Sequence, residues 1–384
     1  MQNEKKLAII GGGPGGLTLA RILALAGREA PHVTLFELDR HVQARPQGGS
    51  LDLHGESGLR ALREAGLEPQ FRALARYDDQ YDAIYDHLGK LHFENSTAEA
   101  GDRPEIDRSQ LRELLLESLD PHVIRWDSKV SSVQPLDSGR VRVLGKDAPL
   151  GEFDLVVGAD GAWSKVRPLL SPEQPRYTGV TFVELSIDDV DAKHPAVAQL
   201  VPRGKVSVVG GNQALIAQRS SNGHVRAYFI FRAPEDWIGQ GALDLSSPER
   251  ARAGLKALLS AWDPRFFAVI DASRDHIVSR PIVELPVGHR WQHRSGLTLL
   301  GDAAHVMSPF SGEGVNMAML DATELALALR ADSDWDRAIT RYEAQMFERA
   351  AIAAAGAHEG LDFVSENSLQ HILEHFRELT AEPS

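Results

Sequence analysis

Residues 7–10 form a short, continuously apolar run, and a glycine cluster at 11–16 follows it directly. An unbroken apolar run of this length that ends in glycine is typical of a buried parallel strand. Residues 17–25 then follow a helical pattern, and residues 33–36 form a second apolar run that ends at Glu37. The pattern therefore predicts a strand, a glycine turn, a helix and a second strand, which is the first unit of a parallel sheet.

The glycines of this turn fit a nucleotide-binding fingerprint. Gly11 permits the tight turn, Gly13 lets the backbone approach a pyrophosphate, and Gly16 lets the helix pack closely on the strand. Glu37 lies about twenty residues beyond the fingerprint, where an acid can accept hydrogen bonds from ribose hydroxyls. We therefore expect the ADP part of a dinucleotide here, with its phosphates at the helix N-terminus. NAD and FAD share this part, so the fingerprint alone leaves the choice between them open.

Two later segments carry further glycines beside an acid. Residues 154–161 form an apolar strand that ends in Gly-Ala-Asp-Gly, with Ser-Lys-Val-Arg following at 164–167. Residues 299–309 read Leu-Leu-Gly-Asp-Ala-Ala-His-Val-Met-Ser-Pro, with Asp302 at the end of the apolar part. Taken alone, Asp302 is better explained as a helix-capping or turn residue. The distant fingerprint at the start of the chain favours a ligand-binding role instead.

Together these segments resemble the group A, single-component FAD-dependent aromatic hydroxylases of the p-hydroxybenzoate hydroxylase fold. The resemblance implies FAD, with Asp302 accepting hydrogen bonds from the ribityl hydroxyls. Pro309 and the nearby glycines would let the backbone approach a flat ring. A helix that starts near Gly314 would aim its N–H groups at the N1–C2 edge of the isoalloxazine, where the reduced flavin carries negative charge.

Four further segments narrow the resemblance to the tetracycline-inactivating flavin monooxygenases: residues 44–54, 104–112, 123–127 and 342–347. The similarity covers nearly the whole chain and weakens between about residues 176 and 275. It implies that Arg45 and Asp52 border the isoalloxazine, that Arg45 also lies in the path of NADPH, and that Arg108 contacts FAD.

The residues around Arg108 give an independent reason for that contact. Asp107 can N-cap a helix and Gln110 can complete a capping box, which places Arg108 in the first turn. A cation is disfavoured at this end by the helix dipole unless an anion offsets it. An anionic cofactor beside Arg108 explains its position, and a solvated Arg108 is the alternative.

The expected FAD-binding residues are Gly11, Gly13, Gly16, Glu37, Arg45, Asp52, Arg108, Asp160, Asp302, Pro309, Gly312, Gly314, Val315 and Asn316. No catalytic side chain and no metal are expected, because the flavin carries the chemistry. His305 is interpreted as a positional residue within the flavin motif.

The rest of the chain completes the predicted architecture. Residues 205–209, 214–217 and 225–231 alternate as strands with glycine or Ser-Asn-Gly turns between them, which predicts an antiparallel sheet. One face of this sheet is interpreted as the substrate-facing wall of a pocket, although the same alternation fits a core face. Residues 335–374 follow a helical pattern, interpreted as a bracing helix.

The predicted fold class is α/β: a GR2-type Rossmann-like FAD-binding domain with an inserted antiparallel-sheet substrate domain and a C-terminal bracing helix. The expected domains are a discontinuous FAD-binding domain at 1–75, 100–172 and 276–330, a substrate-binding domain at 76–99 and 173–275, and a C-terminal helical segment at 331–384.

Composition excludes several classes of protein. A chain of 384 residues with 43% hydrophobic and 25% charged residues is typical of an ordinary globular protein with two domains. The net charge of −13 argues against binding to nucleic acid or to anionic membranes. The absence of cysteine excludes a flavin disulfide reductase, and no tryptophan has another two positions away, as a flavin-dependent halogenase requires. The N-terminus lacks the apolar length of a signal peptide or membrane span, so a cytoplasmic protein is expected. The bracing helix and the single-component family pattern favour a monomer.

The resemblance implies an NADPH-consuming monooxygenase that uses O2 and a flavin C4a-hydroperoxide to hydroxylate an aromatic or polyketide-like small molecule. A flavin-binding sensor or drug-sequestering module with little or no turnover is the alternative. In tetracycline-oxidising members Gln, Arg and His lie in the substrate sheet, and one register of that sheet places Glu184, Lys205 and Arg226 there. Tetracycline inactivation, and with it antibiotic resistance, therefore stays open.

Overall fold

The computed structural model describes residues 5–44, 48–77, 81–95 and 104–372. The chain divides into two compact units, each assembled from three separate segments. The first unit comprises Met1–Ala75, Asp102–Arg176 and Val283–His358. The second comprises Arg76–Gly101, Tyr177–Ile282 and Glu359–Ser384.

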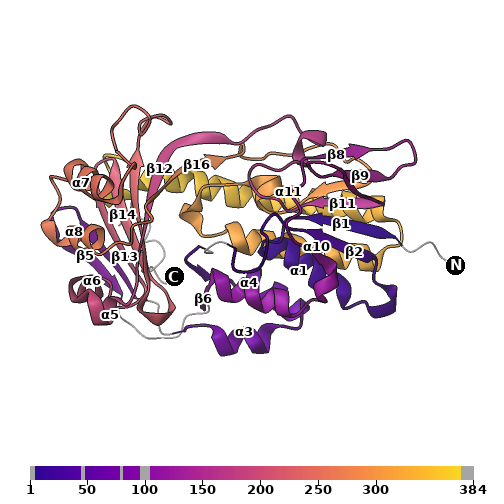
Figure 1. The fold of residues 1–384 in the computed structure, drawn as a ribbon, viewed down its shortest axis with the longest axis horizontal. Coiled ribbons are helices and arrows are strands. Elements are labelled where there is room, and N and C mark those ends of the chain that lie inside the picture. Colours follow the sequence, from indigo (N-terminus) through magenta and orange to yellow (C-terminus); the bar gives the residue numbers. More distant parts are fainter. Residues whose placement is uncertain (1–4, 45–47, 78–80, 96–103, 373–384) are drawn as a thin grey trace, which may run out of the picture. The chain divides into compact units, whose positions relative to one another are not determined.

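The first unit is built on a five-stranded parallel sheet in the order β17-β11-β1-β2-β7 (Figure 1). Its strands are β1 (Lys6–Ile10), β2 (His32–Phe36), β7 (Ile124–Arg125), β11 (Leu155–Gly158) and β17 (Leu297–Leu299). The apolar runs that predicted strands at both ends of the chain thus lie in one sheet, where β11 pairs with both β1 and β17. Leu7, Ala8 and Ile9 are wholly buried, as expected for a central strand.

Helices cover this sheet, and two small sheets complete the unit. The helices are α1 (Pro14–Ala24), α2 (Gly58–Glu64), α3 (Glu68–Leu74), α4 (Arg108–Glu117), α9 (Asp302–His305), α10 (Gly314–Ala331) and α11 (Trp335–Glu359). The small sheets contain β3 (Ser50–Asp52) with β6 (Glu105–Asp107), and β8 (Ser132–Pro135), β9 (Val141–Leu144) and β10 (Pro149–Phe153). The predicted first helix begins at Pro14, because proline suits the first helical position.

The second unit contains a seven-stranded sheet in the order β16-β12-β15-β14-β13-β4-β5. Its strands are β4 (Asp82–Asp86), β5 (Leu91–Asn95), β12 (Arg176–Ile187), β13 (Lys205–Gly210), β14 (Gln213–Arg219), β15 (Val225–Arg232) and β16 (Val278–Glu284). The three predicted strands are confirmed as antiparallel neighbours. The sheet as a whole is mixed, since β4 enters from a distant chain segment and pairs with β13 in parallel.

One face of this sheet packs against four helices. These are α5 (Val190–Lys193), α6 (Pro195–Leu200), α7 (Pro248–Leu258) and α8 (Phe267–Asp271). The buried core there includes Val183, Leu185 and Phe229 from the sheet with Leu255 and Ile270 from the helices. Because neighbouring residues of a strand point to opposite faces, the residues between these positions lie on the other face.

The long C-terminal helix is shorter than predicted. α11 ends at Glu359, and a 3-10 turn begins at Gly360, a residue type that weakens an α-helix. Within the first unit the helix buries Ala350 and Ala354, whereas Ile352 is 78% exposed. Close packing is therefore confined to one face of the alanine-rich stretch.

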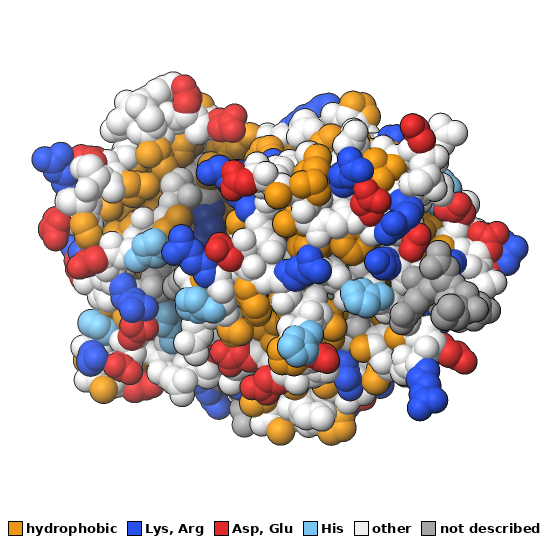
Figure 2. All heavy atoms as spheres, turned by 45° about the vertical axis from the view of Figure 1, so that its right-hand side comes forward, with side chains coloured by type: hydrophobic (Ala, Val, Ile, Leu, Met, Phe, Trp, Pro, Cys, Tyr) orange, Lys and Arg blue, Asp and Glu red, His pale blue; other side chains and the backbone are white. Residues whose placement is uncertain are grey.

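On the face drawn in Figure 2, basic and acidic side chains are interspersed rather than gathered into areas of one sign. Of the helices in the described ranges, none combines the length and the hydropathy that a membrane span requires.

Candidate functional site

The turn between β1 and α1 has the geometry that its glycines predict. Gly11 has a φ of +111°, and a Cβ on Gly16 would lie 2.1 Å from the Gly11 carbonyl oxygen. By contrast, a Cβ on Gly13 would meet no described atom within 4 Å. Gly13 is also the N-cap of α1, so open space lies beside the unbonded N–H groups of the first turn. A phosphate group can approach the backbone there.

Glu37 is buried beside this turn and is held in place by main-chain groups. Its Oε2 accepts a hydrogen bond from Gly12 N at 2.7 Å, and its Oε1 accepts one from Asp39 N at 2.8 Å. Each carboxylate oxygen can accept a second hydrogen bond. The contacts therefore orient Glu37 and leave it capacity for ribose hydroxyls.

Arg112 is a site residue that the sequence interpretation missed. Its guanidinium is buried, donates to Asp39 Oδ2 at 3.1 Å and to Val42 O at 3.0 Å, and lies 3.8 Å from Glu37 Oε2. Arg112 thereby ties α4 to the segment that follows β2. Its position one helical turn after Arg108 was the only local signal, and helical spacing does not reveal a partner so distant in sequence.

The start of α4 corrects one prediction. The helix begins at Arg108 with Asp107 at the N-cap, as expected, but the Asp107 side chain makes no capping hydrogen bond. Gln110 Oε1 is buried without a partner among the described residues, so no capping box forms. Asp107 is the last residue of β6, where it lies opposite Ser50, and the Arg108 N–H donates to the Gly49 carbonyl, so the strand pairing continues into the first residue of the helix.

Arg108 lies beside the segment that leads into β3. A Cβ on Gly48 would lie 3.2 Å from Arg108 Nε, so the guanidinium and this glycine are neighbours. Arg45, the expected partner of the isoalloxazine and of NADPH, lies outside the described residues.

Asp160 follows β11 and has one carboxylate oxygen in use. Its Oδ2 accepts a hydrogen bond from Lys165 N at 2.6 Å, whereas Oδ1 is buried without a partner in the part of the chain that the structure describes. Burial raises the pKa of the Asp160 carboxyl. An unpartnered buried acceptor is costly, and a ligand hydroxyl or N–H would satisfy it.

Arg167 connects this loop to the second glycine element. It is wholly buried, and its guanidinium donates to three carbonyl oxygens: Ala162 at 2.6 Å, Ala303 at 3.0 Å and Glu173 at 3.2 Å. The sequence interpretation used Arg167 only as part of a family motif. The structure gives that motif a physical role, since Arg167 holds the Asp160 loop against α9.

The turn at Gly301 is held by hydrogen bonds to the buried acid Asp321. Asp321 Oδ2 accepts hydrogen bonds from Gly301 N at 3.1 Å and from His305 Nε2 at 2.6 Å. Arg349 Nη2 lies 3.3 Å from Asp321 Oδ1. Burial lowers the pKa of His305, but the Asp321 carboxylate outweighs burial and the net shift is upward. His305 and Asp321 therefore hold the turn that carries Asp302.

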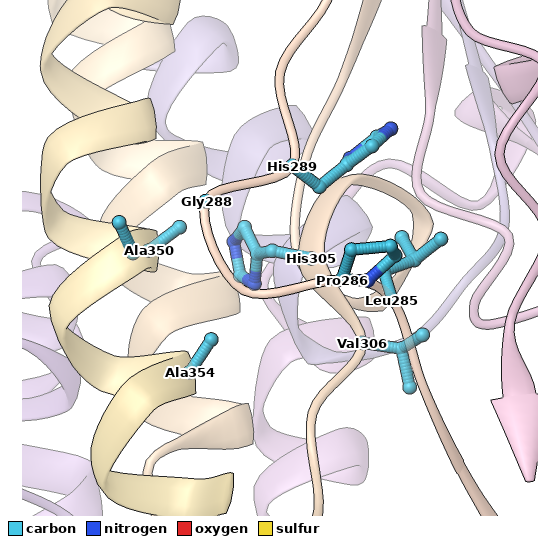
Figure 3. A pocket seen from close by; sticks show the side chains of 9 residues that line it. Leu285, Pro286, Gly288, His289, His305, Val306, Ala350 and Ala354 are labelled. Atoms are coloured by element: carbon cyan, nitrogen blue, oxygen red, sulfur yellow. The ribbon is translucent and has the colours of Figure 1, made fainter.

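A small hollow adjoins His305, as Figure 3 shows. The imidazole lies between the loop that carries Gly288 and the face of α11 that carries Ala350 and Ala354. Asp302 does not line this hollow. Asp302 is exposed, although desolvation by the surrounding protein atoms raises the pKa of its carboxyl. That combination is expected at the floor of a depression, where a ligand hydroxyl can reach the carboxylate.

The glycine segment before α10 lies between two acids. A Cβ on Gly312 would lie 3.6 Å from Asp52 Oδ1, and one on Gly314 would lie 4.0 Å from Asp302 Oδ1. Pro309 begins the 3-10 helix η6 (Pro309–Ser311) that leads into this segment. α10 then begins at Gly314 as expected, with Val315 in its first turn.

Asn316 uses its side chain within the protein. Its Oδ1 accepts hydrogen bonds from His54 N at 3.0 Å and Gly58 N at 3.2 Å, and its Nδ2 donates to Asp52 O at 2.9 Å. These hydrogen bonds orient the Asn316 side chain and join the first turn of α10 to β3 and to the segment before α2.

The two glycine elements from opposite ends of the chain meet in the first unit. A Cβ on Gly15 would lie 2.7 Å from Leu300 Cδ1 and 2.9 Å from Ala318 O. The start of α1 therefore abuts both the second glycine element and the first turns of α10. Open backbone at Gly13, an unpartnered Asp160 oxygen and an accessible Asp302 in one unit fit a flavin dinucleotide.

Comparisons with known proteins agree with this geometry. A family model described as an FAD binding domain matches residues 4–356. Monooxygenase penA from Penicillium thymicola is 33% identical over 372 residues, with 84% of each chain covered.

Solved structures show the same fold. The chain matches Klebsiella pneumoniae HpxO, complexed with FAD and uric acid, with a TM-score of 0.80 at 23% identity, covering 99% of this chain and 93% of that one. It matches tetracycline destructase Tet(55) with a TM-score of 0.75 at 21% identity, covering 98% and 95%. The chain therefore belongs to the FAD binding domain family, and it is an FAD-dependent monooxygenase of the aromatic hydroxylase family that acts on small molecules.

Proposed function

We propose that this monooxygenase is a single-component enzyme that consumes NADPH and hydroxylates an aromatic or polyketide-like small molecule. The observation that carries the proposal is the meeting of the Gly11–Gly16 turn with the 301–316 segment in one unit, because these two elements together would hold both ends of FAD. When bound, FAD receives electrons from the nicotinamide, activates O2 and transfers one oxygen atom to the substrate.

The chain's own groups would bind and orient this cofactor. Glu37 would accept hydrogen bonds from the ribose hydroxyls, and the N-terminus of α1 would bind the pyrophosphate. Arg108 would offset phosphate charge, and Asp302 would accept hydrogen bonds from the ribityl chain. The N–H groups of the first turn of α10 would stabilise negative charge at the flavin edge. Asp160 Oδ1, which has no donor among the described residues, would gain one from the cofactor.

The face of the seven-stranded sheet opposite the helix-covered core supports a small, polar, ring-containing substrate. Glu184 and Tyr228 are paired across β12 and β15 and lie on the face opposite the helix-covered core. The Glu184 carboxylate forms ion pairs with Arg226 and Arg280. An aromatic ring and fixed charges on one face suit a substrate that combines rings with hydroxyl or carbonyl groups.

Tetracycline is one candidate of this class. Glu184 and Arg226 are paired with each other, and Lys205 lies 3.1 Å from Asp82 Oδ2. In one register these three positions correspond to the Gln, Arg and His of tetracycline-oxidising relatives, so the residue types differ. We therefore treat tetracycline as one candidate substrate among several, with no preference over uric acid-like and polyphenolic compounds.

The test is a substrate panel with purified, FAD-loaded protein. The protein is incubated with NADPH and one compound at a time: tetracycline, a purine such as uric acid, and several phenols and polyketides. The masses of the products are measured by mass spectrometry. The proposal expects at least one compound to gain one oxygen atom while it accelerates NADPH oxidation. NADPH oxidation that yields only hydrogen peroxide with every compound would count against it.

A further inference from the structure

His54 lies between two carboxylates from opposite ends of the chain. Its Nε2 is 3.0 Å from Asp52 Oδ2, and its Nδ1 is 3.2 Å from Glu313 Oε1. An ionised carboxylate only accepts hydrogen bonds, so both ring nitrogens must donate. The geometry therefore requires the doubly protonated imidazolium, in a side chain that is only 15% exposed.

The same two segments are also joined through the backbone. His54 N donates to Asn316 Oδ1, and Asn316 Nδ2 donates to the carbonyl of Asp52. Glu313 stands between Gly312, whose φ is +70°, and Gly314. The backbone of the segment is held by hydrogen bonds from Met317 N to Glu313 O and from Gly312 N to Pro309 O. The Glu313 side chain adds the contact that links this segment to His54.

We propose that protonated His54 is a positioning residue, a proton-dependent clasp that fixes the segment 312–314 against β3 and so shapes the place where the flavin ring binds. The proposal rests on FAD binding, and it goes beyond the proposed reaction by adding a group that governs the cofactor site. A neutral His54 has one N–H at most. After deprotonation, one of the two carboxylates faces a nitrogen lone pair, so the hydrogen bond between that carboxylate and His54 is lost.

The charges around His54 explain why the proton is held. The hydrogen bond to Asp52, and then that to Glu313, raise the pKa of His54 to about 9, against a smaller opposing effect of burial. The nearby cations of α2 are engaged elsewhere: Arg60 pairs with Glu324 at 2.7 Å, and Arg63 donates to Gly55 O at 3.0 Å.

The direction of the pH dependence follows from that raised pKa. The ordinary pKa of His54 is 6.5. The contribution of the clasp is therefore fully present below about pH 6.5 and is lost as the pH rises through about 9. Weaker FAD binding is expected on the alkaline side.

The experiment compares full-length wild type with His54→Gln, and with His122→Gln as the matched control. His122 is an exposed histidine of the same unit. The FAD dissociation constant and the visible spectrum of the bound flavin are measured between pH 7 and 9.5. We expect wild type and His122→Gln to lose about fourfold in affinity over this range, because the protonated fraction of a group with a pKa of about 9 falls to roughly a quarter by pH 9.5. His54→Gln should bind FAD weakly at pH 7, and its affinity for FAD should not change across this pH range.

A second variant separates positioning from general loss of structure. Glu313→Gln removes one of the two carboxylates, so the pH step should persist but move toward the ordinary histidine range. This shift tests the clasp even where His54→Gln unfolds. Wild-type affinity and spectrum in His54→Gln throughout, or an unmoved step in Glu313→Gln, would overturn the proposal. These readouts need no substrate and no NADPH, so failure of the hydroxylation assay would leave them interpretable.

Discussion

The buried imidazole of His305 donates to the carboxylate of Asp321, with 2.6 Å between Nε2 and Oδ2. The same oxygen accepts a hydrogen bond from Gly301 N, so one buried acid of α10 holds both the start and the end of the turn that presents Asp302. The flavin-binding turn is thus positioned by residues that never need to touch the cofactor.

Removing the charge of Asp321 should loosen this turn. Asp321→Asn keeps the shape of the side chain but leaves the buried His305 without its anion, and breaking a buried pair costs about 3–5 kcal/mol. We expect a loss of that order in the free energy of unfolding, measured with urea, together with weaker retention of FAD. Asp147→Asn, at an exposed turn, is the control and should match wild type. Equal stability of Asp321→Asn and wild type would show that the pair has no such role.

Two glycines of the first turn should separate folding from cofactor binding. In Gly16→Ala the new Cβ would press on the backbone oxygen of Gly11, so we expect the apo-protein to lose about 3 kcal/mol or more of stability. In Gly13→Ala the Cβ meets open space, and stability should change by no more than about 1 kcal/mol.

Affinity for FAD should nevertheless fall in Gly13→Ala, because the methyl group occupies the approach of the pyrophosphate. Thermal unfolding of the apo-proteins and FAD titration give the two readouts. A Gly13→Ala protein that binds FAD as wild type does would contradict the assigned place of the pyrophosphate.

The buried guanidinium of Arg167 should be essential to the first unit. Arg167→Met leaves the carbonyls of Ala162, Glu173 and Ala303 without their donor, and each unsatisfied buried acceptor costs about 1–3 kcal/mol. We expect a loss of at least about 3 kcal/mol in denaturant unfolding. Arg176→Met removes an exposed arginine of the same unit and should cost little. Similar unfolding midpoints for the two variants would refute the role given to Arg167.

Whether a structural feature can be predicted from the sequence depends on how far apart in the chain the interacting residues lie. The apolar run of β1, the proline start of α1 and the start of α10 at Gly314 are local features, and patterns along the chain predict them. The family resemblance adds the pairing of distant glycine elements.

The capping box predicted at Gln110 does not form; Asp107 instead ends β6, whose partner strand β3 is distant in sequence. Arg112 and Arg167 each have a partner that is distant in sequence: Val42, 70 residues from Arg112, and Ala303, 136 residues from Arg167. No local pattern reveals such contacts, so the residues that brace the site emerge only from the folded chain.

The ion pairs of Glu184 should influence which substrates are accepted. Glu184→Gln frees positive charge on Arg226 and Arg280, so anionic aromatic ligands should bind more tightly than neutral ones by about tenfold relative to wild type. Quenching of flavin fluorescence by matched ligands, such as a benzoate and its amide, measures this ratio. An unchanged ratio would mean that this face of the sheet does not contact the substrate.

The central claim is oxygen transfer from O2 to an organic substrate, and isotope labelling tests it most directly. FAD-loaded protein is supplied with NADPH and a compound from the panel that accelerates NADPH oxidation, under 18O2 in ordinary water. We expect a product that carries one 18O atom and forms only when FAD is present. A product that carries oxygen only from water, or unlabelled substrate with all reducing equivalents recovered as hydrogen peroxide, would contradict it.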